Sequence, residues 1–584
     1  MAKLIAKRTV ADQFISILWA AGVRRIYGVV GDSLNPVVDA VRRHERMDWV
    51  PVRNEEAGAF AAGAEAQLTG RLAACAGSSG PGNLHLVNGL YDAHRSGAPV
   101  LALAAQIPSD EIGTGYFQET HPTLVFQECS HYVEQIVRPA QVARVTQIAI
   151  QHAIGQGGVS VVVLPGDLGA EPAEGAVLEH NYRLGQRPTA RPSDEVLDEL
   201  LELIDGAGKV TLFCGAGCAG AHDEVVALAA RLKAPVGHAL RGKEWIQYDN
   251  PYDVGMSGLL GYGACYEAMR ECDLLLLLGT DFPYVHFMPT DVAIAQVDIR
   301  RERLGRRSRL DLGVWGDVRE TIRAILPRLA ERPDTTFLER MLARHRQLLG
   351  RSVANARDAA DRVPIQPEYA ISILDELAGD DAIFTVDTGM NNVWAARMLR
   401  ATAGRRFIGS FTHGSMANAL PQAIGAQLAY PGRQVISMSG DGGFTMLMGD
   451  FLTLVQERLP VKVVLYDNTS LGMVKLEMLA AGYPDFGTTE VPVDFAAIAV
   501  AAGAVGIRVE DPGQVRDGIQ AVLAADGPAL LDLVTDPMAL ALPPKVRADQ
   551  VRGYALAMTK LVLEGGVAEA YQMARAGLRS IPKP

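Results

Sequence analysis

The stretch QVISMSGDGGFTMLMGDFLTLVQERLPVKVVLYDN, residues 434–468, decides the fold. A first apolar run ends at Gly-Asp-Gly (440–442), an amphipathic stretch follows, and a second apolar run ends at Asp-Asn (467–468). This order predicts a strand, a helix and a neighbouring parallel strand. Asp441 and Asn468 should then lie together at the carboxyl edge of the sheet, where open α/β sheets bind ligands.

The same alternation of apolar runs and amphipathic stretches continues along most of the chain, which predicts parallel sheets covered by helices on both faces. The fold class is therefore α/β. Polar, proline-bearing segments at 170–192 and 327–367 interrupt the pattern and suggest boundaries near residues 185 and 350, although FLERMLARHRQLLG within the second segment favours a helix. The predicted domains are 1–185, 186–350 and 351–540, followed by a tail over 541–584. The strand-like runs are 24–30, 99–105, 159–167, 209–217, 273–279, 435–443 and 461–468.

The composition excludes several classes of protein. The 584 residues are 48% hydrophobic and 21% charged, as in a folded chain of several domains. The net charge of −12 gives no reason to expect a nucleic-acid partner. Six cysteines without two-residue spacing indicate reduced thiols in a cytoplasmic protein, and the apolar runs are too short for a signal peptide or a membrane span.

The residues at the two predicted strand ends suit a magnesium–diphosphate clamp. Carboxylate and amide oxygens such as those of Asp441 and Asn468 are ligands for Mg²⁺, which keeps bonds to substrate phosphates. The glycines allow the backbone to approach a phosphate closely. An isolated Gly-Asp-Gly describes a surface turn equally well, with Asn468 as a helix cap. The 24 residues that separate it from Asp467, arranged as strand, helix and strand, favour the clamp.

This spacing resembles the signature of thiamine-diphosphate enzymes, and further segments are similar to the bacterial pyruvate oxidases that reduce ubiquinone. These segments are RNEEAGAFAAGAEAQLTG (53–70), GSSGPGNLHLVNGLYDAHR (77–95), GTGYFQETHP (113–122), HALRGKEWIQYDNPYDVGMSGL (238–259), GSFTHGSMANALPQAIGAQ (409–427) and LGMVKLEMLAAGYPDFGT (471–488). The resemblance implies three doubly wound domains, which bind the pyrimidine, FAD and the diphosphate with magnesium. It also implies oxidative decarboxylation of pyruvate to acetate and CO₂ through hydroxyethyl-thiamine diphosphate, with electrons passing through FAD to ubiquinone.

The resemblance also assigns roles to single residues. The family's Arg-His-Glu-Glu run corresponds to residues 53–56, so Glu55 is the acid that activates the aminopyrimidine, with Asn54 in place of the histidine. Met416 matches the bulky residue that holds the coenzyme bent, and the carbonyl of Gly414 accepts a bond from the aminopyrimidine. The metal ligands are Asp441, Asn468 and the carbonyl of Ser470. The diphosphate side also includes Ser415, Gly442, Gly443, Leu471, Gly472 and Met473, and the substrate side includes Asn83, Phe117, Gln118 and the 473–477 segment ending at Glu477.

For FAD the resemblance indicates residues along three segments. They are Ser257, Gly258, Leu259 and Leu260; Thr280, Asp281, Phe282, Pro283 and Tyr284; and Asp298. A Gly-x-Gly-x-x-Gly run at 215–220 follows a predicted strand and opens a predicted helix, but the acidic partner of a nicotinamide fold is missing about 20 residues later.

At several of these positions a purely structural role is an alternative to the functional one. Glu55 also suits a solvated acid at a helix start, Met416 a core filler, and Asp298 a helix cap. Asp467 stands where the family often has asparagine, and strand alternation should turn it away from Asn468. Met473 stands where close relatives have an aromatic residue.

The tail carries an apolar stripe beside basic residues, which predicts a helix in an anionic membrane interface or one docked on the protein. The resemblance favours the inner face of the cell membrane, and cofactors between the subunits of a homo-oligomer, a dimer of dimers. Other activities remain open: an acetolactate synthase-like carboligase, an oxygen-dependent oxidase that forms acetyl phosphate, or a scaffold without turnover. The stripe is Val567, Tyr571, Ala574, Leu578 and Ile581, with Arg575, Arg579 and Lys583 nearby.

Overall fold

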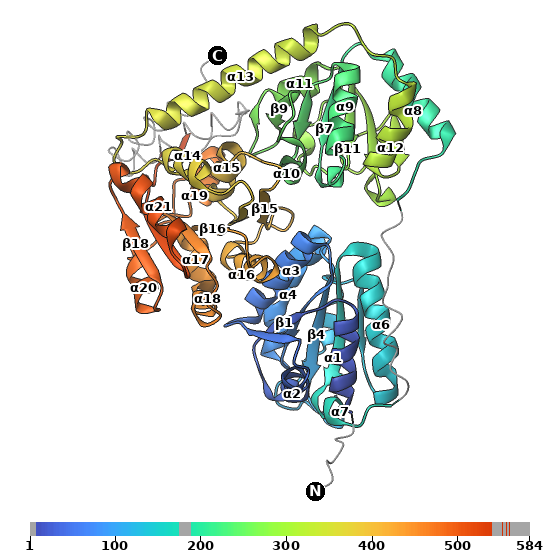
Figure 1. The fold of residues 1–584 in the computed structure, drawn as a ribbon, viewed down its shortest axis with the longest axis vertical. Coiled ribbons are helices and arrows are strands. Elements are labelled where there is room, and N and C mark those ends of the chain that lie inside the picture. Colours follow the sequence, from blue (N-terminus) through green and yellow to red (C-terminus); the bar gives the residue numbers. More distant parts are fainter. Residues whose placement is uncertain (1–7, 175–188, 540–551, 553–555, 558–559, 561–584) are drawn as a thin grey trace.

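The computed structural model describes residues 8–174, 189–539, 552, 556, 557 and 560. Three sheets form three domains, one after another along the chain (Figure 1). In this view the N-terminal domain lies at the bottom, the middle domain at the upper right and the C-terminal domain at the left. The predicted α/β class with three parallel-sheet domains is confirmed.

The N-terminal domain is a parallel sheet in the order β2-β1-β3-β4-β6-β5 with helices on both faces. Its strands are β1 Arg25–Gly28, β2 Asp48–Pro51, β3 Ala73–Gly77, β4 Val100–Gln106, β5 Tyr132–Gln135 and β6 Val159–Pro165. Its main helices are α1 Val10–Ala20, α2 Asn35–Arg43, α3 Glu55–Thr69, α4 Pro81–Ser96 and α6 Val142–His152. Helices α1, α2 and α6 bury one face of the sheet, and α3 and α4 bury the other.

The middle domain has the order β10-β9-β8-β7-β11-β12-β13, parallel apart from the two-residue β10. β11 consists of five leucines that are all buried, as a central parallel strand requires. The strands are β7 Val210–Cys214, β8 Val236–His238, β9 Asp253–Met256, β10 Tyr262–Gly263, β11 Leu274–Leu278, β12 Ala293–Asp298 and β13 Leu312–Trp315. The helices include α8 Asp194–Gly206, α9 His222–Leu232, α10 Lys243–Ile246, α11 Cys265–Glu271 and α12 Val318–Ile325.

The C-terminal domain repeats the parallel architecture in the order β15-β14-β16-β17-β19-β18. The strands are β14 Ile383–Val386, β15 Arg406–Gly409, β16 Val435–Gly440, β17 Lys462–Asp467, β18 Val505–Val509 and β19 Ala529–Val534. The helices are α14 Pro367–Leu377, α15 Met390–Met398, α16 Ala419–Ala429, α17 Asp441–Leu447, α18 Phe451–Gln456, α19 Gly472–Ala481, α20 Phe495–Ala501 and α21 Val515–Ala524. Helices α14, α15 and α21 cover one face, and α16, α18 and α20 the other.

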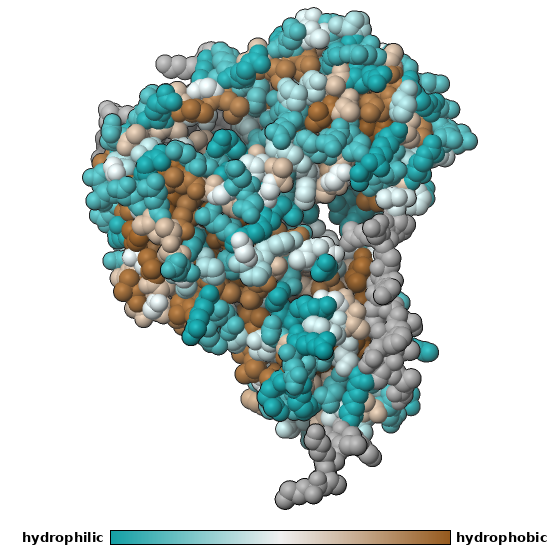
Figure 2. All heavy atoms as spheres, in the orientation of Figure 1, coloured by the Kyte–Doolittle hydropathy of each residue, from teal (hydrophilic) through white to brown (hydrophobic). Residues whose placement is uncertain are grey.

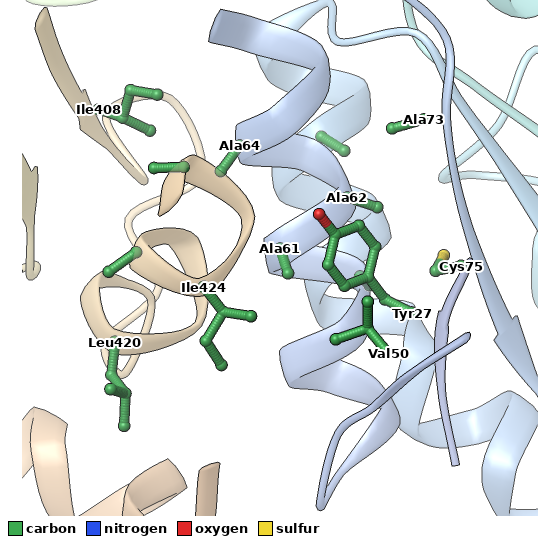
Figure 3. Packing of buried hydrophobic residues seen from close by; sticks show 14 of the residues in the cluster. Tyr27, Val50, Ala61, Ala62, Ala64, Ala73, Cys75, Ile408, Leu420 and Ile424 are labelled. Atoms are coloured by element: carbon green, nitrogen blue, oxygen red, sulfur yellow. The ribbon is translucent and has the colours of Figure 1, made fainter. Parts of the chain in front are cut away.

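One apolar core joins the N-terminal and C-terminal domains. Alanines of α3 fill the space between the first sheet and α16, where Leu420 and Ile424 face them (Figure 3). The approach is so close that a Cβ atom at Gly425 would lie 2.0 Å from the carbonyl oxygen of Ala61. The small-residue run of α3 therefore lets the two domains pack backbone to backbone.

The predicted boundary near residue 350 falls inside α13 Thr336–Arg357, which crosses from the middle to the C-terminal domain (Figure 1). The helical pattern in this segment therefore prevails over the linker pattern. The predicted tail stripe lies outside the described residues. Among the residues that are described, no helix combines the length and apolar character needed to cross a membrane.

Candidate functional site

A pocket lies at the carboxyl edge of the third sheet, where β14, β16 and β17 end. β16 and β17 pair in parallel, with Gly440 opposite Tyr466, so Asp441 and Asn468 follow neighbouring strands as predicted. Both side chains belong to residues that line this one pocket. The predicted residues in its lining are Met416, Asp441, Gly442, Gly443, Asn468, Ser470, Leu471, Gly472 and Met473.

The carboxylate of Asp441 is buried in an acidic environment. Burial, together with the negative charges of Asp467 and Glu490, raises its pKa to about 7. Its Oδ2 atom is buried and receives no hydrogen bond from any described residue. A buried acceptor without a donor, surrounded by like charges, fits a site for a cation.

The other two expected metal ligands lie on the turn after β17. Asn468 Oδ1 accepts a hydrogen bond of 3.1 Å from the backbone N–H of Ser470, and the Ser470 carbonyl accepts one of 2.8 Å from Gly472. Each oxygen keeps a lone pair for an ion. In the described parts of the chain, no three His, Cys, Asp or Glu side chains gather as a metal site. The donor set is therefore one carboxylate, one amide and one carbonyl, which suits Mg²⁺.

Asp467 is buried outside the pocket lining, as strand alternation predicts. Its Oδ2 lies 3.5 Å from a guanidinium nitrogen of Arg508, and its Oδ1 accepts a hydrogen bond from Thr469. Its charge nevertheless reaches Asp441, so its effect on the site is larger than the sequence suggests.

Asp387 is a buried residue that was not predicted and that lies behind the pocket lining, against Gly443. It follows β14, so a third strand end contributes to the same edge, and burial raises its pKa to about 7. A Cβ atom at Gly443 would lie 1.9 Å from Asp387 Oδ2, so only glycine fits there. The signal was present in the sequence, because the apolar run 383–386 ends in Asp-Thr-Gly as 435–440 ends in Gly-Asp-Gly.

The loop 410–416 brings Met416 to the pocket, whereas the predicted Gly414 and Ser415 are absent from its lining. Gly414 has φ +80°, a conformation that favours glycine. The Ser415 hydroxyl accepts a hydrogen bond from Asn88 of α4 and donates one to the Met416 carbonyl, and Met416 lines the pocket beside the strand ends.

The predicted acid lies at the carboxyl edge of the first sheet. Glu55 is the first residue of α3, and Asn54 caps that helix by accepting a hydrogen bond from the backbone of Glu56. Glu55 is only 6% exposed, so it is not a solvent-exposed acid at a helix start, which was the structural alternative. Its Oε2 lies 3.0 Å from Nδ1 of His85, and its Oε1 would be 2.9 Å from a Cβ atom at Gly82.

Three other expected substrate-side residues lie at this same first edge. Asn83 is fully buried, donates 2.7 Å to the Ala105 carbonyl, and leaves its Oδ1 without a donor among the described residues. Gln118 has φ +62° and accepts a hydrogen bond from Ser79. The neighbouring Phe117 is 78% exposed.

Among the described residues, those of the first edge do not contribute to the pocket at the third sheet. Glu55, Asn83, Phe117 and Gln118 are absent from the lining of the pocket at the third sheet. Glu477 is exposed on α19 and is also absent from that lining, although Met473 and Val474 of the same helix contribute to it. The structure therefore presents two half-sites.

The residues expected to bind FAD gather at the carboxyl edge of the middle sheet, after β9, β11 and β12. The hydroxyl of Ser257 is buried and unpartnered within the described chain. Gly258 has φ +110°, and a Cβ atom there would lie 3.1 Å from the ring of Phe282 and 3.2 Å from that of Tyr284. These features fit a flat ligand with polar substituents. Thr280 and Pro283 belong to the loop after β11, and Leu259 and Leu260 follow Gly258.

Asp298 and Asp281 differ in their surroundings. Asp298 is buried, which raises its pKa, and its carboxylate accepts a hydrogen bond of 2.8 Å from the backbone of Arg300. Asp281 faces three arginines of a local basic stretch that the overall charge does not reveal. They are Arg303, Arg306 and Arg307, at 3.9, 3.4 and 3.1 Å.

The sequence pattern predicted that the Gly-x-Gly-x-x-Gly run opens a helix, but in the structure the helix does not follow directly. A short 3₁₀ turn, Ala216–Cys218, comes first, and α9 begins at His222. Gly217 instead packs against the loop after β11, donating 2.9 Å to the Gly279 carbonyl.

Three family models match the three domains in order. They describe the N-terminal TPP binding domain (residues 8–125), the central domain (197–325) and the C-terminal TPP binding domain (387–533) of thiamine pyrophosphate enzymes.

Several known proteins are similar to the chain. It is 32% identical to the pyruvate oxidase of Lactiplantibacillus plantarum over 89% of this chain and 87% of that protein. It is 30% identical to the acetolactate synthase of Arthrospira platensis over 91% and 94%. It is 55% identical to an uncharacterized 42.6 kDa protein of Pseudomonas amyloderamosa over 62% and 89%. With all three domains matched in order, the chain belongs to the thiamine pyrophosphate enzymes.

Proposed function

We propose that this enzyme decarboxylates pyruvate oxidatively to acetate and CO₂ and passes the electrons through FAD to ubiquinone. The observation that carries the proposal is the pocket at the third sheet, where Asp441, Asn468 and the Ser470 carbonyl surround glycines that leave room for a diphosphate. Similarity to a pyruvate oxidase over most of the chain supports pyruvate as the substrate.

Thiamine diphosphate supplies, when bound, a carbanion that attacks the substrate carbonyl and accepts electrons on loss of CO₂. The chain's residues hold and orient it. Asp441, Asn468 and Ser470 would hold Mg²⁺ against the diphosphate, and Met416 would support the rings. The carboxylate of Glu55 would hold a proton at the aminopyrimidine, a role that suits its buried place at the start of α3.

Two copies of the chain are proposed to complete each site. Glu55 and the pocket belong to different half-sites of one chain, so the acid of one copy would meet the pocket of another. Around Glu55, the first edge exposes Val30, Leu84, Tyr116 and Phe117. Around the pocket, the third edge exposes Met446, Met448 and Val474. Exposed apolar patches of this kind mark protein interfaces.

Apolar side chains also gather on the surface over the C-terminal domain, at the left of Figure 2. The same reasoning supports a homo-oligomer, and a dimer of dimers is the proposed form. Sedimentation with and without thiamine diphosphate and Mg²⁺ tests it, and a chain that stays monomeric with full activity would contradict it.

FAD would bind at the carboxyl edge of the middle sheet. This edge faces the other two domains: Arg241 donates to the Ser96 carbonyl of the N-terminal domain, and Lys243 to the Ala396 carbonyl of the C-terminal domain. A flavin there would lie near the junction of the three domains, as electron transfer from the thiamine site requires. The quinone, and docking of the tail on the inner face of the cell membrane, extend the proposal beyond the described residues.

An anaerobic titration of the purified enzyme with pyruvate tests the function. Flavin absorbance should bleach on addition of pyruvate and return on addition of ubiquinone, with acetate as the product. Acetolactate formation with the flavin remaining oxidised would instead indicate a carboligase. In a parallel assay under air, strict phosphate dependence with peroxide release would indicate an oxygen-dependent oxidase.

A further inference from the structure

The loop 410–416 is held by the N-terminal domain, although it belongs to the C-terminal one. It joins β15 to α16 and contains Gly414 at φ +80°, with Ala417 at φ +66° directly after it. A residue other than glycine rarely adopts a positive φ, so contacts with the rest of the protein must maintain the conformation of Ala417. Besides hydrogen bonds within the loop, such as that from the Ser415 N–H to Ser410 Oγ, these contacts come from one face of α4.

Asn88 makes the contacts nearest to the pocket. Its Nδ2 donates to Ser415 Oγ at 2.8 Å and to Glu56 Oε1 at 2.7 Å, and its Oδ1 lies 2.8 Å from Nε2 of His413. The hydroxyl of Ser415 then donates to the Met416 carbonyl at 2.9 Å. A chain of hydrogen bonds thus runs from Glu56, beside the predicted acid, to the backbone of the pocket-lining Met416.

Other residues of α4 hold the far end of the loop. Asp92 accepts a hydrogen bond of 2.8 Å from Ser410, and the ring of Tyr91 stacks on His413 with centroids 5.5 Å apart. Neither side chain hydrogen-bonds to Ser415 or Met416, whereas both N–H groups and the carbonyl of the Asn88 amide take part in hydrogen bonds. Only an amide side chain of this length supplies two N–H donors and one carbonyl acceptor at these positions.

From this geometry we infer that Asn88 is a positioning residue for the thiamine diphosphate pocket. It fixes the position of Met416 in the pocket lining, where the coenzyme would bind. The inference rests on the proposed function, because it concerns the pocket assigned to that coenzyme. Misplacement of a site residue by about 1 Å can cost on the order of 100-fold in rate, which gives a loop anchor of this kind a measurable role.

The test compares Asn88→Ala with Tyr91→Phe in the full-length enzyme with Mg²⁺. Asn88→Ala should weaken thiamine diphosphate binding by roughly 10- to 100-fold, as loss of a supporting contact does in other sites, and lower kcat at saturating coenzyme. Its flavin content and its melting temperature without thiamine diphosphate should stay near wild type. Tyr91→Phe is the matched control, because it keeps the ring on His413 and removes only the hydroxyl bond to Glu128.

A double-mutant cycle separates positioning from general destabilisation. Ser415→Ala alone should weaken coenzyme binding several-fold, and the double variant Asn88→Ala/Ser415→Ala should bind no more weakly than Asn88→Ala alone, because both remove one chain of contacts. Additive losses would overturn the inference. So would wild-type coenzyme affinity and kcat in Ser415→Ala, a variant that keeps the proposal testable if Asn88→Ala does not fold. A wild-type enzyme that binds no thiamine diphosphate would refute the proposed function instead.

Discussion

The carboxyl edges of the first and third sheets share a buried carboxylate at a helix start but differ in whether the strand ends form a pocket. Each places a buried carboxylate, Glu55 or Asp441, at the first residue of a helix that follows the edge. At the third edge three strand ends close around a pocket within one chain. At the first edge the acid sits among exposed side chains, with Phe117 78% and His85 51% exposed. The third edge thus forms a pocket within one chain, whereas the residues of the first edge lie outside that pocket.

Replacing the acid of the first edge should have the largest effect on activity. Glu55→Gln should leave coenzyme binding nearly intact but lower kcat by orders of magnitude, because an amide cannot hold the proton at the aminopyrimidine. Steady-state kinetics and coenzyme titration measure the two effects separately. The adjacent Glu56→Gln, which keeps an acceptor for Asn88, is the control and should stay within a few-fold of wild type. Unchanged kcat in Glu55→Gln would remove it from the mechanism.

The acid of the third edge should act on binding instead. Asp441→Asn keeps the size of the side chain but removes the charge that would face the ion, so Mg²⁺-dependent binding of thiamine diphosphate should weaken by on the order of 100-fold. Calorimetric titration with Mg²⁺ and coenzyme checks this. The exposed Asp511→Asn in the same domain should bind normally. If Asp441→Asn also binds normally, the ion does not sit at this strand end.

The third edge should also be the more sensitive to added volume. Gly443→Ala places a methyl group against Asp387, where a Cβ atom would be 1.9 Å from the carboxylate, and should lower the unfolding free energy by about 1–3 kcal/mol. Gly432→Ala is the control, since nothing lies within 4 Å of its added Cβ atom. Denaturant unfolding compares the two. Equal stabilities would mean that Asp387 moves aside freely and that the strand ends are not closely packed.

An effect of similar size, which depends on pH, concerns the contact between the two domains. Burial raises the pKa of Asp92 to about 6, although Ser410 and Gln422 donate hydrogen bonds to it. The folded state then holds this proton more tightly than the unfolded chain, whose aspartates titrate near pH 4. The stability contributed by Asp92 is full below about pH 4 and is lost as the pH rises through about 6.

In the wild type, the titration of Asp92 should lower the unfolding free energy by about 1–3 kcal/mol between pH 4 and pH 7. The Asp92→Asn variant should not show this decrease. Unfolding curves at several pH values, read as the difference between the two proteins, isolate this group from other titrations. Parallel pH profiles would show that Asp92 does not titrate in this range.

The sequence predicted the third edge better than the first. Asp441 and Asn468 are separated by one strand–helix–strand unit, and parallel pairing brings such strand ends together whatever the rest of the molecule does. Asp387 carries the same local pattern after β14 but was not recognised. Asp467 was placed correctly by alternation, yet its influence on the pKa of Asp441 depends on burial that alternation does not measure.

Contacts distant in sequence could not be predicted in this way. Asn88 and Ser415 are 327 residues apart, and their hydrogen bond exists because α3 packs on both α4 and α16 through alanines and glycines. The boundary near residue 350 shows the converse, since a charged stretch with prolines nearby continued as α13.

The sequence by itself determined the α/β class, the order of the domains and the residues at each strand end, because strand periodicity and turn chemistry are local. The tertiary structure alone decided that Glu55 is absent from the lining of the pocket that Asp441 and Asn468 share, and that α4 contacts the Met416 loop. These relations depend on how separately folded sheets pack, and packing selects among arrangements that local patterns leave equally open.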